Sequence, residues 1–257
     1  MSTQVFDTEV LPNYTLVGFK NVDTGEVVQI RRHEPDAPAR LRRFMLQPDT
    51  TFIGFNSKSF DDPVVLAFVA GRTEPEIKRM ANDIIDNRLQ HWQVAKKYGL
   101  PRLDYDSVDL IEVAPSFVGL KTYGARMHMP RLQEMPLAHD EDITDEQRAV
   151  IDTYNINDLD TTEELLRQLD GELMLRVQMS RQYGVDMRSK SDSQMAEQAY
   201  ITSLKIPRQD NDIPLSVRYT PPAFLEFTTP ALAALLKRVS EHVFKINSAT
   251  GHPYNPD

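Results

Sequence analysis

Cysteine is absent from this chain of 257 residues. Its absence excludes a disulfide framework and every metal site built on thiolate ligands, zinc fingers included. A metal ion can therefore be bound only through oxygen atoms or through the six histidines.

The sequence also lacks a long apolar run. No stretch is long enough to span a bilayer, and the N-terminal segment MSTQVFDTEV has no basic region followed by a long apolar run, as a secretory signal would have. We therefore expect a cytoplasmic protein with no membrane partner. The composition, 40% hydrophobic and 26% charged, is typical of a globular protein, and the length suits one large domain or a domain with an appendage.

Positive charge is in deficit, since 29 lysines and arginines face 38 acidic residues and the net charge is −9. Non-specific affinity for nucleic acid depends on neutralising phosphates, so this balance predicts weak binding by the chain alone. Two local clusters of basic residues weaken this argument against nucleic-acid binding. The first comprises Arg31, Arg32, Arg40, Arg42 and Arg43, and the second Lys121, Arg126, His128 and Arg131. Most such runs are solvated faces, so contact of either cluster with phosphate stays open.

Four carboxylates in three separated segments are the most informative residues present. The first segment, VFDTEV, predicts a strand, in which Asp7 and Glu9 project from the same face. Two carboxylates in one small volume repel each other unless a cation neutralises them, and hard ions such as Mg²⁺ prefer oxygen ligands. A D-x-E triplet is nevertheless expected about once in a chain of this size, so a solvated strand end is the alternative.

The second segment is FNSKSFD, which ends at Asp61. It follows the strand-like run TTFIGFN and precedes DPVVLAFVA, which can begin a helix with Pro63 in its first turn. Asp61 thus lies where a strand gives way to a helix. The alternative is that Asp61 or Asp62 only caps that helix.

The third segment spans residues 144–169, where apolar side chains recur at roughly helical spacing. Tyr154 and Asp158 then lie one turn apart on the same helical face. Taken alone, they are more often an ordinary surface pair. The order of the three segments, each on a suitable element, favours a shared site with two metal ions.

FDTE, the N-x-x-x-F-D of Asn56 to Asp61 and the Y-x-x-x-D of Tyr154 to Asp158 resemble, in order, the three motifs of the DEDD 3′→5′ exonucleases with Tyr in the third motif. The second motif is most similar to that of phage family B DNA polymerase proofreading domains. The resemblance covers about residues 1–170, strong in the motifs and weak between them. VDLIEVAPSFVGLKTYG is similar to the D-L…S-L-K stretch of the family, but Gly119 stands where Ser is common, which weakens a substrate role for Lys121.

The resemblance implies a ribonuclease-H-like fold, two Mg²⁺ or Mn²⁺ ions, and hydrolysis of single-stranded DNA from its 3′ end to nucleoside 5′-monophosphates. By this resemblance, Asp7 bridges both metals, and Glu9 and Asp158 hold the metal that activates water. Asp61 holds the second metal, and Tyr154 orients the water. Asn56 and Phe60 shape the pocket for the terminal nucleotide. Asp62 competes with Asp61 for the second metal.

The rest of the sequence predicts an α/β layer with a mixed sheet flanked by helices. The expected strands cover 5–10, 15–21, 26–32, 50–56 and 107–113, and the expected helices 36–47, 62–70, 74–99, 116–127 and 144–169. On the long helix over 74–99 the apolar stripe comprises Ile77, Met80, Ile84, Ile85, Leu89 and Trp92.

The character of the sequence changes near residue 170, so we expect an exonuclease domain over 1–170 and a mostly helical extension over 171–257. Within the extension, helices are expected over 172–184, within 185–204 and over 229–246, with irregular chain over 208–227 and 247–257. No D-T-D-type polymerase motif is present. The chain is then expected to be a domain cut from a DNA polymerase or a separately encoded exonuclease, with the extension as linker or docking arm.

Two alternatives remain open. A 3′→5′ exoribonuclease would use the same carboxylates, because discrimination of the 2′-hydroxyl cannot be inferred from these motifs. A non-catalytic docking module of a replisome would retain the carboxylates as vestiges, although the intact motifs argue against it. If the chain is encoded by a phage, its place is the cytoplasm of the host cell.

Overall fold

The computed structural model describes residues 2–206, 214–247 and 253–254. The chain divides into two compact units, Met1–Lys205 and Ile206–Asp257. The three sequence segments with the candidate carboxylates all lie in the first unit.

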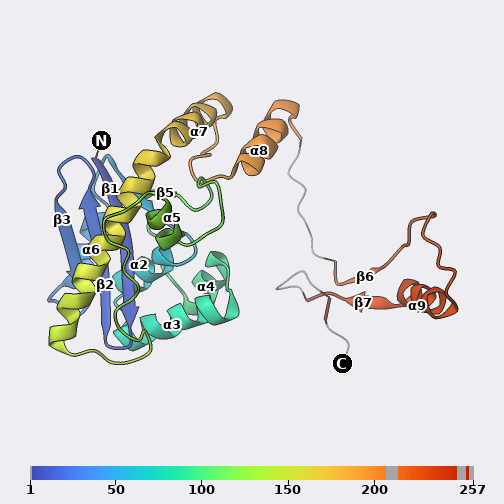
Figure 1. Ribbon diagram of the computed structural model, residues 1–257, viewed down its shortest axis with the longest axis horizontal. Helices are drawn as coiled ribbons and strands as arrows, with labels where there is room; N and C mark the ends of the chain where they lie inside the picture. The colour runs from blue at the N-terminus through green and yellow to red at the C-terminus, as the bar shows by residue number, and fades with distance from the viewer. Residues whose placement is uncertain (1, 207–213, 248–252, 255–257) are drawn as a thin grey trace. The chain divides into compact units, whose positions relative to one another are not determined.

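The first unit is built on a five-stranded sheet with the strand order β3-β2-β1-β4-β5 (Figure 1). Its strands are β1 (Ser2–Leu11), β2 (Tyr14–Asn21), β3 (Val27–Arg31), β4 (Thr50–Gly54) and β5 (Asp106–Asp109). β1, β2 and β3 form an antiparallel meander, while β4 and β5 run parallel to β1. The predicted mixed sheet of an α/β protein is confirmed. β5 ends earlier than expected, because turn hydrogen bonds begin at Leu110.

Helices cover both faces of this sheet. The helices of the first unit are α1 (Ala37–Met45), α2 (Asp61–Val69), α3 (Glu74–Asn87), α4 (His91–Tyr98), α5 (Leu120–Arg126), α6 (Asp145–Gln168), α7 (Asp170–Tyr183) and α8 (Asp192–Leu204). α6 begins at a capping box in which the Thr144 hydroxyl accepts from the Gln147 N–H, and the Gln147 side chain accepts from the Thr144 N–H. This helix packs along β1 and β2, and that packing positions the third motif against the first.

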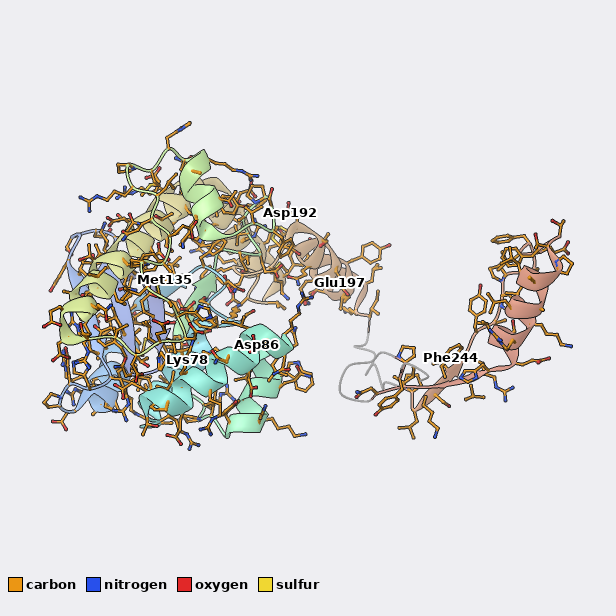
Figure 2. The ribbon with its side chains drawn as sticks, turned by 60° about the horizontal axis from the view of Figure 1, so that its bottom comes forward. Lys78, Asp86, Met135, Asp192, Glu197 and Phe244 are labelled. Carbon is orange, nitrogen blue, oxygen red and sulfur yellow. The ribbon has the colours of Figure 1, made fainter. Side chains whose placement is uncertain are left out.

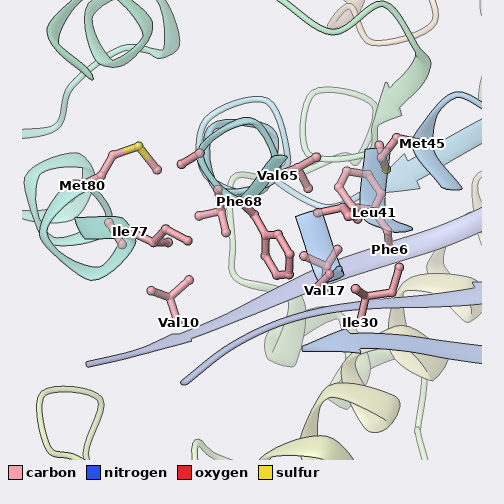
Figure 3. Packing of buried hydrophobic residues seen from close by; sticks show 14 of the residues in the cluster. Phe6, Val10, Val17, Ile30, Leu41, Met45, Val65, Phe68, Ile77 and Met80 are labelled. Carbon is pink, nitrogen blue, oxygen red and sulfur yellow. The ribbon is translucent and has the colours of Figure 1, made fainter. Parts of the chain in front are cut away.

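Alternate residues of β1 enter different cores. Phe6 belongs to the same core as Phe68 of α2 and Ile77 of α3, on one side of the sheet (Figure 3), whereas Val5 belongs to the core that contains Leu159 of α6. Each such side chain contributes roughly 1.5–3 kcal/mol when fully buried. Because both faces are covered, β1 is nearly continuously buried, and its polar residues cannot simply face solvent.

The prediction of a single helix over 74–99 is wrong. α3 ends at Asn87, Arg88 takes a left-handed conformation with φ 49°, and α4 begins after Gln90. The Gln90 N–H donates to the Gln93 side chain in a new N-terminal capping box. The break rotates the second half, so Trp92 of the expected apolar stripe is 53% exposed.

α7 and α8 belong to the first compact unit, which therefore extends beyond the expected boundary at residue 170. Ser189, in the connection between them, accepts from the Asp109 N–H at 3.0 Å, and Arg188 pairs with Asp106. The buried Arg176 of α7 donates at 2.6 Å to Asp192. Asp192, labelled in Figure 2, is the first residue of α8. A functional division at residue 170 stays a prediction.

The second unit contains a short antiparallel pair, β6 (Ser216–Arg218) with β7 (Val243–Lys245), and the helix α9 (Pro230–Glu241). The expected helix over 229–246 thus stops at Glu241, because the next residues pair with a strand inside the segment expected to be irregular. Residues 208–213 of that segment, and 248–252 and 255–257 of the expected terminal coil, lie outside the described residues. Among the helices described, none is both long and apolar enough to cross a membrane.

Candidate metal centre

Three of the four expected carboxylates converge. One carboxylate oxygen from each of Asp7, Glu9 and Asp158 lies within 4.8 Å of the other two. Asp7 and Glu9 leave β1 on the same face, as strand alternation requires. α6 crosses that face and brings Asp158 to them from about 150 residues further along the chain.

Burial and mutual repulsion make these carboxylates difficult to ionise. Burial raises the pKa of Asp7 well above its ordinary value, and the charges of Glu9 and Asp158 raise it further. The pKa of Glu9 is raised in the same way, by burial and then by Asp158. A cation among the three would remove this cost, since it favours the charged form of each neighbour.

Asp61 is buried next to this cluster but outside the mutual 4.8 Å. Its Oδ1 accepts both from the Thr8 backbone N–H at 3.0 Å and from the Thr8 hydroxyl at 2.6 Å. Thr8 lies between Asp7 and Glu9, and its side chain points to the opposite face of β1. Asp61 is nevertheless close enough to Glu9 that its charge raises the pKa of Glu9.

The capping alternative for Asp61 does not fit the described contacts. Phe60 occupies the N-cap position of α2, and Asp61 uses its Oδ1 to hold β1. Asp62 is directed elsewhere: it accepts from the Tyr105 hydroxyl at 2.6 Å, and burial raises its pKa to about 6. Asp62 lines a cavity of about 470 Å³ together with Tyr105 and His91. Of the two aspartates, Asp61 is the one whose charge acts on Glu9.

Tyr154 lies one helical turn before Asp158 and is 5% exposed. Burial, and then the charge of Asp158, raise the pKa of this phenol. Lys121, at the start of α5, places its Nζ 5.2 Å from the centre of the Tyr154 ring. Burial raises the pKa of Asp158, and the charge of Lys121 opposes that rise. The amine also pairs with Glu134 at 3.0 Å. Lys121, whose substrate role Gly119 weakens, thus lies beside Tyr154 and Asp158.

Asn56 and Phe60 lie in the loop between β4 and α2. Asn56 adopts a left-handed conformation with φ 59°, and Phe60 is half-buried against the core of Figure 3. Asp109 holds this loop, because its carboxylate accepts from the backbone N–H of Asn56 at 2.7 Å and of Lys58 at 3.0 Å. The role of Asn56 and Phe60 in binding a nucleotide stays a prediction.

Two residues of the site were missed in the sequence. Asp109 is the last residue of β5, and its only signal in the sequence was its place in the D-L of VDLIEVAPSFVGLKTYG. Asn155 adjoins Tyr154 within the third motif, and its Nδ2 donates to Oδ2 of Asp7 at 3.0 Å. A single amide in a helix has no periodic signature, so nothing in the sequence marked it.

The two basic clusters differ in their contacts. In the first, Arg31 pairs with Asp152 and Glu34, and Arg32 donates to two backbone carbonyls, so these guanidinium groups join parts of the fold. In the second, Lys121 stands at the acidic cluster. The second cluster thus places a cation beside Asp158 and Tyr154, whereas Arg31 and Arg32 of the first are bound within the fold.

The donor set fits a hard divalent ion. It consists of carboxylate oxygens alone, in a volume small enough for one cation to touch all three, and Mg²⁺ or Mn²⁺ prefers such ligands. No protein-family profile matches the chain, and no curated protein matches its sequence.

Proposed function

We propose that the chain is a metal-dependent 3′→5′ exonuclease that hydrolyses single-stranded DNA ends to nucleoside 5′-monophosphates. The observation that supports it best is the convergence of Asp7, Glu9 and Asp158, with Tyr154 beside them. These residues come from the first and third motifs of the resemblance, and only folding brings them together. The sheet order and the mixed strand directions are compatible with the ribonuclease-H-like fold that the resemblance implies.

Asp7, Glu9 and Asp158 would hold the metal, and Asp61, bonded to Thr8 of β1, would contribute to a second ion. Two divalent ions supply, when bound, an activated water and neutralisation of the charge on the scissile phosphate. The carboxylates must be ionised to bind them, so their raised pKa values mean that binding releases protons.

Tyr154 would orient the attacking water through its hydroxyl. Its raised pKa keeps the phenol protonated at neutral pH, so it donates a hydrogen bond and does not act as a bulk base. The proton released by the water would pass to solvent or to a neighbouring carboxylate.

Lys121 would face the phosphate of the terminal nucleotide. Its ion pair with Glu134 involves a glutamate side chain that is 89% exposed, and such pairs are worth about 0–1 kcal/mol. The amine can therefore exchange Glu134 for a phosphate at little cost. This second basic cluster would partly offset the net charge of −9.

The partner implied by the resemblance is a DNA polymerase domain or subunit, for which the exonuclease would proofread. The second unit would then serve as its linker or docking arm. Its exposed apolar side chains, among them Leu215 and Phe224, suit a surface that is covered in an assembly.

The test uses 5′-labelled single-stranded DNA and RNA of one sequence, each incubated with Mg²⁺, Mn²⁺ or excess EDTA. We expect DNA to shorten from its 3′ end with either metal, no shortening in EDTA, and no shortening of DNA that ends in a 3′-phosphorothioate linkage. Undiminished hydrolysis in EDTA contradicts the metal mechanism. Faster hydrolysis of RNA than of DNA would make the chain an exoribonuclease. If the chain binds metal but hydrolyses neither DNA nor RNA, the result favours the non-catalytic docking module.

A further inference from the structure

Asn155 lies fully buried between α6 and the sheet, beside the acidic cluster. Its Nδ2 donates to Oδ2 of Asp7 at 3.0 Å, and its Oδ1 accepts from Nε2 of Gln29 at 3.2 Å. Both ends of the amide are thus bound, one to a candidate metal ligand and the other to β3.

The direction of this hydrogen-bond chain is forced by its other members. Arg31 can only donate, and its Nη2 donates to Oε1 of Gln29 at 3.1 Å. The backbone carbonyl of Asp152 can only accept, and Nε2 of Gln29 donates to it at 2.9 Å. Gln29 therefore donates an N–H to Asn155. Asn155 must accept it with its side-chain carbonyl oxygen, so its NH₂ group is directed at Asp7.

Gly18 provides the space for this amide. Asp7 pairs with Gly18 across β1 and β2, and Gly18 pairs with Gln29 across β2 and β3, so the three form one row across the sheet. A Cβ atom at Gly18 would lie 1.8 Å from Oδ1 of Asn155, and its three nearest atoms would all belong to Asn155. The glycine is required here by the close approach of the helix side chain.

We propose that Asn155 is a positioning residue that fixes the plane of the Asp7 carboxylate for metal binding, with Gly18 and Gln29 holding the amide in place. The assignment rests on the proposed function, because it takes Asp7 as a metal ligand. A neutral donor suits this position: an acidic side chain would add a further negative charge to the cluster, and an apolar one would leave the half-buried carboxylate of Asp7 with one hydrogen bond fewer.

The test measures Mn²⁺ affinity by calorimetric titration and stability by thermal unfolding, in the full chain. Partners that orient metal ligands typically contribute about 10–100-fold in affinity, so Asn155→Ala should weaken Mn²⁺ binding by about tenfold or more. Gly18→Ala should do the same by displacing the amide. Combined with Asn155→Ala it should add little, because the new methyl group then occupies vacated space.

Asn13→Ala is the matched control. The Asn13 side chain also makes two hydrogen bonds, with the backbone N–H and carbonyl of Ile143, in contact with the start of α6 and not with the carboxylates. It should lower the unfolding temperature and leave Mn²⁺ affinity unchanged. If Asn155→Ala does not fold, Gln29→Met keeps the length of the side chain, frees Oδ1 of Asn155, and should weaken Mn²⁺ binding to a smaller extent.

Two results separate this assignment from the function beneath it. If the wild type binds Mn²⁺ and hydrolyses DNA, but Asn155→Ala binds Mn²⁺ equally tightly or the effects of Asn155→Ala and Gly18→Ala multiply, the positioning role is overturned and the exonuclease stands. A wild type that binds no Mn²⁺ overturns both.

Discussion

Thr8 and Asp61 are joined by two hydrogen bonds to a single carboxylate oxygen, from the Thr8 backbone N–H at 3.0 Å and from its hydroxyl at 2.6 Å. Thr8 separates Asp7 from Glu9 in β1, so the second motif is attached to the middle of the first. The position of Asp61 relative to the acidic cluster is therefore set by β1 as well as by α2.

Replacing Thr8 tests this attachment. Thr8→Val keeps the shape of the side chain but removes one donor from a buried carboxylate, so we expect a loss of about 1–3 kcal/mol in the free energy of unfolding, together with slower hydrolysis. Denaturant titration and single-turnover rates measure the two effects.

Thr15→Val is the control for that substitution. Thr15 is fully buried in β2, and its hydroxyl has no hydrogen-bond partner among the described residues. Its replacement should leave stability unchanged or raise it, because it removes an unpaired polar group. Equal losses in both variants would mean that the bond to Asp61 contributes nothing of its own.

The metal ligands should be separable from their acidic neighbours. Asp7→Ala, Glu9→Ala, Asp61→Ala and Asp158→Ala should each remove most turnover while the far-ultraviolet circular dichroism stays that of a folded chain. Each change deletes charge or geometry at the metal, so Mn²⁺ affinity should fall as well.

Asp62→Asn and Asp160→Asn are the matched controls, because each changes an aspartate next to a candidate metal ligand or within its motif helix. Asp62 is turned toward Tyr105, and Asp160 pairs with Lys20 at 2.6 Å, so both variants should keep most activity. An inactive Asp62→Asn with an active Asp61→Ala would exchange the two assignments in the second motif.

The meander, the parallel strand β4 and the third-motif helix could be predicted because each has a strong local pattern. The break after Asn87 could not, since no proline or glycine lies between Glu74 and Tyr98 other than Pro75, and the left-handed Arg88 has no signature of its own. Exposure of Trp92 follows from that break.

Within the candidate site, same-face geometry on β1 and on α6 could be worked out from spacing alone. The attachment of Asp61 to Thr8 could not, because it depends on how α2 packs beneath the sheet. The same holds for Asn155, whose partner Asp7 lies 148 residues away in the sequence. Contacts of this kind are fixed by tertiary packing and leave no periodic trace.

Stability should depend on pH in opposite ways with and without metal. In the metal-free chain the pKa values of Asp7, Glu9 and Asp61 are raised by folding. Their contribution to the free energy of unfolding is therefore complete below about pH 4, the ordinary pKa of an unfolded carboxyl. It is lost as the pH rises toward the pKa values of the folded chain. Arg188 lowers the pKa of Asp106, so that group acts oppositely and loses its contribution as pH falls below about 4.

The measurement is thermal unfolding between pH 4 and 8, with EDTA or with excess Mn²⁺. We expect the EDTA curve to fall toward neutral pH and the Mn²⁺ curve to rise, because bound cations favour the ionised carboxylates. Asp7→Asn, which cannot ionise, should flatten the EDTA curve. Parallel curves in the two conditions would mean that the ion does not bind at these carboxylates.

Tyr154→Phe tests the residue that defines the third motif. If the hydroxyl orients the attacking water, its removal should slow single-turnover hydrolysis by about ten- to a thousandfold, the range for one positioned hydrogen bond in a transition state, and leave Mn²⁺ affinity nearly unchanged. Tyr123→Phe removes another buried phenol, bonded to the backbone of Ser116 at 2.6 Å, and should lower stability without slowing hydrolysis. Equal rates for Tyr154→Phe and wild type would reduce Tyr154 to a packing residue, and a loss of Mn²⁺ would make it part of the structure of the metal centre.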